Sequence, residues 1–101
     1  MEKDATITEL LDWLRERLGN AFAITDHWEA DRCAIGISAP ADPAQLVYIL
    51  TWGRPSGYCA VELEAAPPPG SEMPYEDIGK FDLVSRDELL GIVRKHLRIS
   101  Q

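Results

Sequence analysis

The stretch LVYILTWGRPSGYCAVELE, residues 46–64, alternates apolar side chains with others on both sides of a glycine-containing turn. Alternation with a period of two is typical of β-strands, and Gly53, Pro55 and Gly57 mark the turn. The segment therefore predicts a β-hairpin with strands at residues 46–52 and 58–64, joined by a loop at residues 53–57.

The odd length of this loop predicts which side chains share a face of the hairpin, because opposite residues of an antiparallel pair point to the same side. One face should collect small and β-branched side chains: Val47, Ile49, Thr51, Cys59, Val61 and Leu63. The other face should collect larger and charged side chains: Leu46, Tyr48, Leu50, Trp52, Tyr58, Glu62 and Glu64. We expect helices to cover the first face and the second to be the outer face.

The rest of the chain supplies two helices and further strands. Apolar residues recur at helical spacing over residues 6–18 and again over residues 89–97. Thr6 with Glu9, and Ser85 with Glu88, have the spacing of capping boxes, and Gly19 suits a left-handed helix end. Strands are expected at residues 21–28 and 33–38, with a short edge strand near residues 80–84. The order predicts a single α+β domain over residues 1–101: a two-layer sandwich in which N- and C-terminal helices pack on one face of a four- to five-stranded antiparallel meander.

The charge balance limits the partners of the chain. Seventeen acidic residues against ten Lys and Arg give a formal net charge of −7. Proteins that bind nucleic acid need a basic stripe, and the one basic cluster here, Arg94, Lys95 and Arg98, fits the end of the last helix. We therefore expect no nucleic-acid or membrane binding, and favour a cationic protein partner. Without a signal-like or spanning apolar run, and with two cysteines outside any C-x-x-C pair, a cytoplasmic location is expected.

No constellation in the sequence predicts catalysis, a metal or a cofactor. His27 and His96 lack zinc-ligand spacing with Cys33 or with Cys59. Cys59 falls on the face of the hairpin that we expect the helices to cover, and thiols in such a core are inert. The acidic corner at residues 26–31 has the composition of a solvated turn, and the loop at residues 53–57 lacks the strand–loop–helix setting of a phosphate loop. We expect a protein that is not an enzyme.

The outer face is the candidate partner-binding surface. Tyr and Trp anchor protein interfaces because they combine a large rigid body with a polar group. From residue 33 to residue 79 there are six acids and one base, Arg54 at the turn. The predicted surface consists of Tyr48, Leu50, Trp52, Arg54, Tyr58, Glu62 and Glu64. Two alternatives remain open: a second copy of the chain forming a homodimer, or intramolecular cover by the Pro-rich loop at residues 65–75.

A family resemblance adds to this interpretation. The opening helix contains Leu10-Leu11-Asp12-Trp13-Leu14, and the strands contain Tyr48-Ile49-Leu50-Thr51-Trp52-Gly53 and Tyr58-Cys59-Ala60-Val61-Glu62-Leu63-Glu64, before a closing helix that ends in His96-Leu97. This element order resembles the TriTu family of small bacterial immunity proteins, over nearly the whole chain. The loop at residues 65–77 is longer than that family's linkage. The resemblance implies a non-enzymatic protein that binds and neutralises a co-encoded toxin, here a cationic one.

The main alternative is an acidic, secretion-chaperone-like or other protein-binding module that acts as a homodimer. Obligate dimerisation and binding of extended peptides would favour it over the immunity protein. A pocket that contained His27 beside a strongly shifted carboxylate would instead favour a small enzyme.

Overall fold

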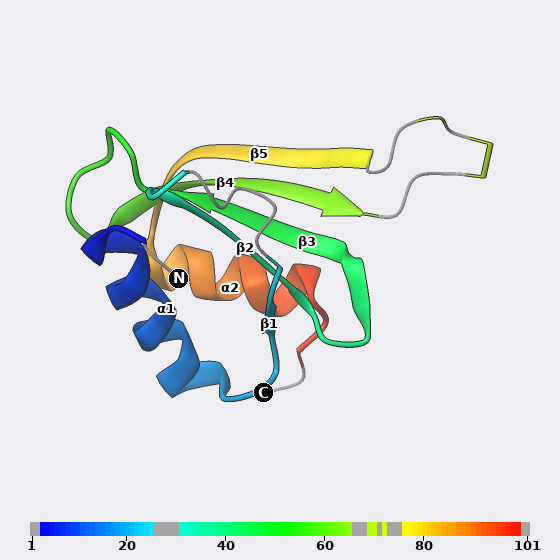
Figure 1. Cartoon of the computed structure of the whole chain (residues 1–101), viewed down its shortest axis with the longest axis horizontal. Coiled ribbons are helices and arrows are strands. Elements are labelled where there is room, and N and C mark those ends of the chain that lie inside the picture. The colour runs from blue at the N-terminus through cyan, green and yellow to red at the C-terminus, as the bar shows by residue number, and fades with distance from the viewer. Residues whose placement is uncertain (1–2, 26–30, 66–68, 71, 73–75, 100–101) are drawn as a thin grey trace.

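Two helices cover one face of a five-stranded antiparallel sheet in the computed structural model (Figure 1). The structure describes residues 3–25, 31–65, 69–70, 72 and 76–99. The elements are α1 (Ala5–Leu18), β1 (Ala23–Ile24), β2 (Ala34–Ala39), β3 (Asp42–Leu50), β4 (Tyr58–Ala65), β5 (Glu76–Ser85) and α2 (Arg86–His96). The strands lie side by side in chain order, β1 to β5. The predicted α+β meander with terminal helices is confirmed.

The start of α1 differs in detail from the prediction. Asp4, not Thr6, is the N-cap, and its carboxylate accepts hydrogen bonds from the backbone N–H and the hydroxyl of Thr6. Because Asp caps a helix at least as well as Thr, α1 begins at Ala5, one residue before the predicted start. At the other end Gly19 has the expected positive φ, 57°, and its N–H bonds to the Arg15 carbonyl, but its ψ of −130° lies outside the left-handed helical conformation.

α2 begins with the predicted capping box. Ser85 accepts a hydrogen bond from the Glu88 backbone, and the Glu88 carboxylate accepts one from the Ser85 N–H. α2 ends at His96 with Leu97 as its C-cap, and the next residue, Arg98, has a positive φ of 57°. The Ile99 N–H reaches back to the Arg94 carbonyl, which is the hydrogen-bond pattern of a Schellman end in which glycine is the usual residue.

One hydrophobic cluster joins both helices to the sheet. Its members are Ile7, Leu10, Leu11, Leu14, Leu18, Phe22, Ile35, Ile37, Val47, Ile49, Cys59, Val61, Val84, Leu89, Val93 and Leu97. The members from β2, β3 and β4 all have one parity, so the helices cover the face that the sequence predicted. Within the part of the chain that the structure describes, no helix is long and apolar enough to cross a membrane.

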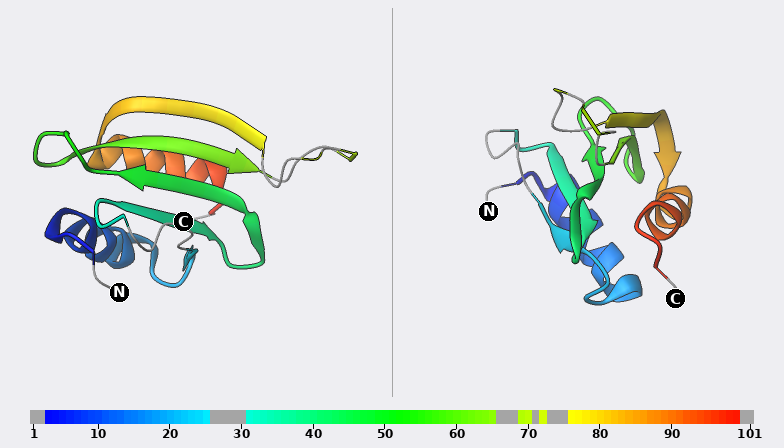
Figure 2. Two further views of the ribbon diagram at one scale, coloured as in Figure 1. Left: turned by 45° about the horizontal axis from the view of Figure 1, so that its top comes forward. Right: turned by 90° about the vertical axis from the view of Figure 1, so that its right-hand side faces the viewer.

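The strand bounds differ from the predictions at both edges of the sheet. β1 is only Ala23–Ile24, and residues 26–28 of the expected first strand lie outside the described residues. β5 has 10 residues where a short piece near residues 80–84 was expected. It pairs with β4 along its length and carries two register shifts. Figure 2 shows β5 at the open edge of the sheet, remote from β1.

The register of the central hairpin is as predicted. Five pairs are observed, from Leu46 opposite Glu64 to Leu50 opposite Ala60. Tyr48 lies opposite Glu62, and Ile49 lies opposite Val61. Trp52 lies beyond the end of β3, on the turn that leads into β4.

Candidate functional site

The turn between β3 and β4 is closed by its own backbone. The Arg54 N–H donates to the Thr51 carbonyl at 3.1 Å, and the Tyr58 N–H donates to the Pro55 carbonyl at 3.0 Å. Gly53 and Gly57 have φ values of 72° and 83°, which other residues rarely adopt. The two glycines therefore allow a tight turn with a defined shape.

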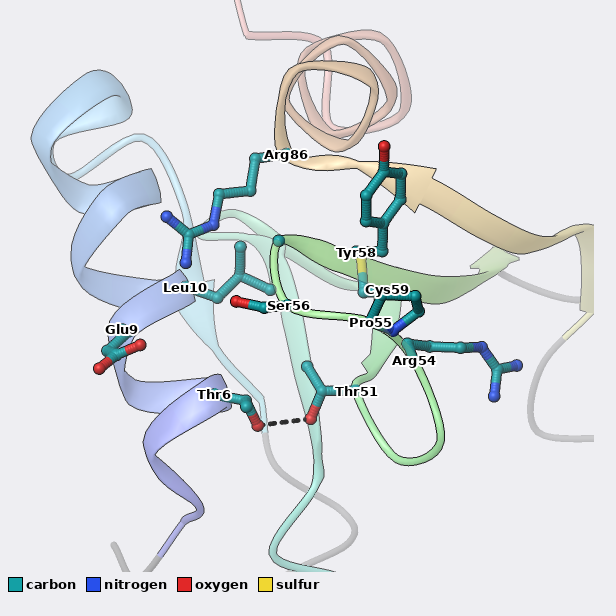
Figure 3. A pocket seen from close by; sticks show the side chains of 11 residues that line it. Thr6, Glu9, Leu10, Thr51, Arg54, Pro55, Ser56, Tyr58, Cys59 and Arg86 are labelled. Carbon is teal, nitrogen blue, oxygen red and sulfur yellow. Dashed lines mark hydrogen bonds between the residues drawn. The ribbon is translucent and has the colours of Figure 1, made fainter.

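Arg54 ties this turn to the neighbouring strand β5. Its Nη1 donates to the Trp52 carbonyl at 2.9 Å, and its Nε donates to the Asp82 carbonyl at 2.9 Å. The side chain is half-buried, and Figure 3 shows it pointing away from α1, whereas Arg86 points toward that helix. The sequence placed Arg54 at the turn as a partner contact. In the structure its guanidinium holds the turn in position.

α1 holds the other end of the turn. The Thr51 side chain is 9% exposed, and its Oγ1 lies 2.7 Å from Oγ1 of Thr6 (Figure 3). Because the Thr6 hydroxyl donates its proton to Asp4 at 2.6 Å, Thr51 is the donor of this bond. The Thr51 N–H also donates to the Cys33 carbonyl at 2.9 Å. The turn is thus connected to α1, β2 and β5.

Trp52 projects from this anchored turn. It is 77% exposed, more than any other large apolar side chain of the described residues. An indole in water exposes a large apolar surface that interface formation would bury. Because the surrounding backbone is held by hydrogen bonds, a partner would bind Trp52 without ordering a loose loop. Among the described residues, Trp52 is the strongest candidate for contact with a protein partner.

The cavity behind the turn is small. It has a volume of about 40 Å³ and is lined by Thr6, Glu9, Leu10, Thr51, Arg54, Pro55, Ser56, Gly57, Tyr58, Cys59 and Arg86 (Figure 3). Sites for small molecules are usually several hundred Å³. Burial raises the pKa of the Cys59 thiol to about 11, against the opposing charge of Arg54. The thiol is therefore protonated at neutral pH, as the prediction of an inert core cysteine requires.

The structure separates the predicted surface into buried and accessible members. Tyr48 is 7% exposed, so the expectation that it lies on an open face is wrong. Leu46 and Ala60, on the same face, are 0% and 6% exposed. Parity places Tyr48 on the outer face as predicted, but the centre of that face is covered within the monomer. The Tyr48 side chain is thus covered within the chain, whereas the predicted cover by the loop at residues 65–75 lies mostly outside the described residues.

The accessible members gather toward the turn and β5. Tyr58 is 43% exposed, and Leu50 and Glu64 are half-buried. Glu62 forms an ion pair with Lys80 of β5 at 3.2 Å. A groove of about 240 Å³ brings together Leu50, Arg54, Ala60, Val61, Glu62, Lys80, Phe81 and Asp82. Of the predicted set, Leu50, Arg54 and Glu62 share this groove, whereas Tyr48, Tyr58 and Glu64 do not line it.

The sequence interpretation missed the contribution of β5 to this groove. Lys80 and Asp82 alternate with Phe81, which is the period-two pattern of a strand with one charged face. This alternation is the sequence signal for the contribution of β5. The sequence alone does not show which face of the sheet the charged side chains occupy, because it does not identify the strand that pairs with residues 80–84.

His96 also has a role that the sequence did not reveal. It is 8% exposed, and its Nε2 lies 2.8 Å from the Glu64 carbonyl. A carbonyl oxygen only accepts, so Nε2 carries the proton and donates it. The His96 carbonyl in turn accepts a hydrogen bond of 3.1 Å from Gln45. His96 therefore links α2 to β4 and β3. His27 and the acidic residues 26–29 lie outside the described residues.

Within the described residues, no group of three His, Cys, Asp or Glu side chains is arranged to hold a metal ion. Comparisons of the chain with protein-family models, with curated proteins and with solved structures find no match.

Proposed function

We propose that this protein is a non-enzymatic immunity protein that binds a co-encoded cationic toxin domain and neutralises it in the cytoplasm. The observation that carries the proposal is the exposed indole of Trp52 on a turn anchored to three other elements. Trp is the residue type most enriched among the anchors of protein interfaces.

The charge of the chain supports a cationic partner. The net charge is −7, and Glu62 borders the groove beside the Trp52 turn. Complementary fields accelerate encounter between proteins and discriminate against partners of like charge. A toxin domain that acts on nucleic acid carries the opposite charge, so an acidic surface suits it. The resemblance to TriTu immunity proteins points to the same class of function.

The size of the cavity argues against a small-molecule site behind the Trp52 turn. A volume of about 40 Å³ behind the turn holds water but not a metabolite. The one thiol that lines it, Cys59, has its pKa raised by burial. The turn exposes the aromatic side chain of Trp52, which suits recognition of a protein surface.

A growth experiment tests the proposal. This chain is expressed with the polypeptide encoded immediately upstream of its gene, which alone should arrest growth. We expect wild-type chain to restore growth and Trp52→Ala to restore it poorly. Trp13→Ala is the matched control, because Trp13 lies half-buried on α1 with the Arg17 guanidinium 4.0 Å from its ring centroid. A neighbour that is harmless, or that stays toxic beside the wild-type chain, would contradict the proposal.

A purified complex gives a second readout. The association rate should fall steeply as salt is raised, because salt screens the attraction between oppositely charged partners. A rate that does not depend on salt would remove the electrostatic part of the proposal. Equal affinities of wild type and Trp52→Ala would remove its aromatic part.

A further inference from the structure

The outer edge of β5 is open. β5 is the last strand of the sheet order, and no strand of the described residues pairs with its far side (Figures 1 and 2). Three of its apolar side chains, Ile78, Phe81 and Leu83, are 49%, 41% and 54% exposed. Such an edge presents backbone donors and acceptors that a further strand can use. We infer that β5 pairs with β5 of a second copy of this chain, antiparallel, with Phe81 on the twofold axis.

The charges of β5 are complementary to themselves in this arrangement. Lys80 lies opposite Glu62, a residue of the outer face, and both Lys80 and Asp82 line the groove beside it. If Phe81 faces Phe81 of the second copy, Lys80 faces Asp82 of the second copy. The twofold axis repeats this pair, with Asp82 facing Lys80 of the second copy. Two opposite-charge pairs then flank a central aromatic pair, and cross-strand pairs of both kinds are stabilising.

Neighbouring registers lack this complementarity. In a sheet that continues across a twofold axis, the helix-covered faces of both copies lie on the same side. Residues that lie opposite each other must therefore both be odd-numbered or both be even-numbered. Moving the axis by one residue in either direction places Lys80 against Lys80, or Asp82 against Asp82. Directly opposed like charges destabilise a strand pair. The charge pattern therefore selects the register centred on Phe81.

The direction of the backbone groups agrees with this register. The N–H of Thr51, just after β3, bonds to the carbonyl of Cys33, just before β2, so odd-numbered residues of β3 direct their backbone groups toward β2. Along a strand, the backbone N–H and C=O groups of successive residues point alternately to the two sides of the strand. Opposite residues of an antiparallel pair therefore exchange hydrogen bonds only in every second pair. Following the observed registers from β3 to β5, Phe81 directs its groups toward β4, and Lys80 directs its groups to the outer edge. Lys80 is therefore placed to form backbone hydrogen bonds with a second copy across this edge. The Asp82 carbonyl already accepts a hydrogen bond from Arg54 Nε, so at that position the pairing depends on the side chains.

The same edge limits the strength of the dimer. The register shifts of β5 lie between the pairs Cys59–Val84 and Val61–Phe81, and between the pairs Leu63–Gly79 and Glu64–Asp77. The regular stretch between the shifts is residues 79–81, and Asp82 lies in the first shift, so only a short segment can pair, which is less than the contact of an obligate dimer. We expect a weak, concentration-dependent dimer. Trp52 lies on the β3–β4 turn outside β5, so this inference stands independently of the proposed function.

Sedimentation of the full-length chain over a concentration series from about 1 µM to about 1 mM tests the inference. The wild type should dimerise. Asp82→Lys, which keeps the Lys80–Glu62 ion pair, should weaken the dimer about tenfold or more, because Lys would oppose Lys twice. Lys80→Glu should weaken it similarly, because Glu would oppose Asp82 twice. An equimolar mixture of the two variants should form a heterodimer, since each Lys of one then faces an acid of the other.

The control is Arg32→Glu, which makes the same change of charge as Lys80→Glu in the turn before β2, away from β5. It should dimerise as the wild type does. Thermal melts show which variants fold, and Asp82→Lys alone decides the question if Lys80→Glu does not. A wild-type chain that stays monomeric throughout would overturn the inference. So would an Asp82→Lys variant that dimerises normally, or a mixture of folded variants that stays monomeric.

Discussion

Arg54 donates a hydrogen bond of 2.9 Å from its Nε to the backbone carbonyl of Asp82. This bond joins a turn between β3 and β4 to the strand at the open edge of the sheet. Arg54 also bonds the Trp52 carbonyl through Nη1, so one guanidinium ties the backbone of Trp52 to β5. The backbone that carries the most exposed aromatic side chain of the described residues is thus held by a half-buried arginine.

Removing this guanidinium should loosen the turn. We expect Arg54→Ala to lower the free energy of unfolding by about 1–2 kcal/mol, because two backbone carbonyls lose their donor. Hydrogen exchange of the amides of residues 52–57 should become faster. Arg54→Lys is the control: it keeps the charge but cannot reach both carbonyls with a planar fork, so it should restore little. Full recovery by Lys would show that charge alone matters.

Trp52 and Tyr48 should respond oppositely to truncation. Trp52 is 77% exposed, so Trp52→Ala should change the free energy of unfolding by less than about 0.5 kcal/mol. Tyr48 is 7% exposed, so Tyr48→Ala should cost about 3 kcal/mol through the cavity that it leaves. Urea denaturation of both variants measures the difference. A large loss of stability in Trp52→Ala would mean that the indole is part of the core.

Arg98 should tolerate replacement by glycine better than by alanine. Its φ of 57° is unfavourable for a residue with a Cβ, and glycine adopts it without strain. We expect Arg98→Gly to raise the free energy of unfolding by about 1 kcal/mol. Arg98→Ala keeps the Cβ and should give no gain. If the alanine variant is stabilised equally, the benefit comes from removing the charge and not from the backbone.

The N-cap of α1 should contribute to the acid sensitivity of the protein. Hydrogen bonds from the Thr6 hydroxyl and then from its backbone N–H, with the charge of Arg32, hold the pKa of Asp4 below its ordinary value of 3.8. A carboxyl group with a lowered pKa in the folded state stabilises the fold at neutral pH. This contribution is lost as pH falls from the ordinary value through the folded one.

The variant Asp4→Asn tests this contribution. Asn also caps a helix, but it does not titrate. The difference in melting temperature between wild type and Asp4→Asn should therefore shrink as pH is lowered below 3.8. A difference that is constant with pH would mean that Asp4 acts as a cap without a shifted pKa.

The two cysteines should differ in reactivity. Cys59 is buried and its pKa is raised to about 11, whereas Cys33 is half-buried. Near pH 8, iodoacetamide should modify Cys33 first, since the thiolate is the reactive form. In Cys33→Ser, modification of the remaining thiol should follow unfolding by urea, as read by mass spectrometry. Equal rates for both thiols in the native chain would contradict the assigned burial of Cys59.

Local patterns predicted much of the fold. Period-two alternation and the odd loop at residues 53–57 predicted five residue pairs of β3 and β4, and the structure confirms them. The capping box at Ser85 and a positive φ at Gly19 are also observed. These features depend on residues close together in the chain, or on one turn, so the sequence contains the information that they require.

The candidate site was less predictable. Parity placed Tyr48 on the outer face but could not show that this face is covered at its centre. Arg54 was expected as a contact at the turn, whereas its bond to Asp82 spans 28 residues of chain. The extent of β5 was underestimated because Gly79 and charged residues weaken its strand signal, while pairing with β4 supplies the hydrogen bonds.

The sequence by itself determined the elements, their order and the two faces of the central hairpin, because helical and strand periodicity are properties of neighbouring residues. Only the tertiary structure decided which outer-face residues remain exposed, how Arg54 anchors the Trp52 turn, and how far the edge strand β5 extends on both sides of Lys80, Phe81 and Asp82. These features arise from contacts between segments far apart in the chain. No local pattern specifies which distant segment covers a face of the sheet, or whether a further strand pairs with its edge.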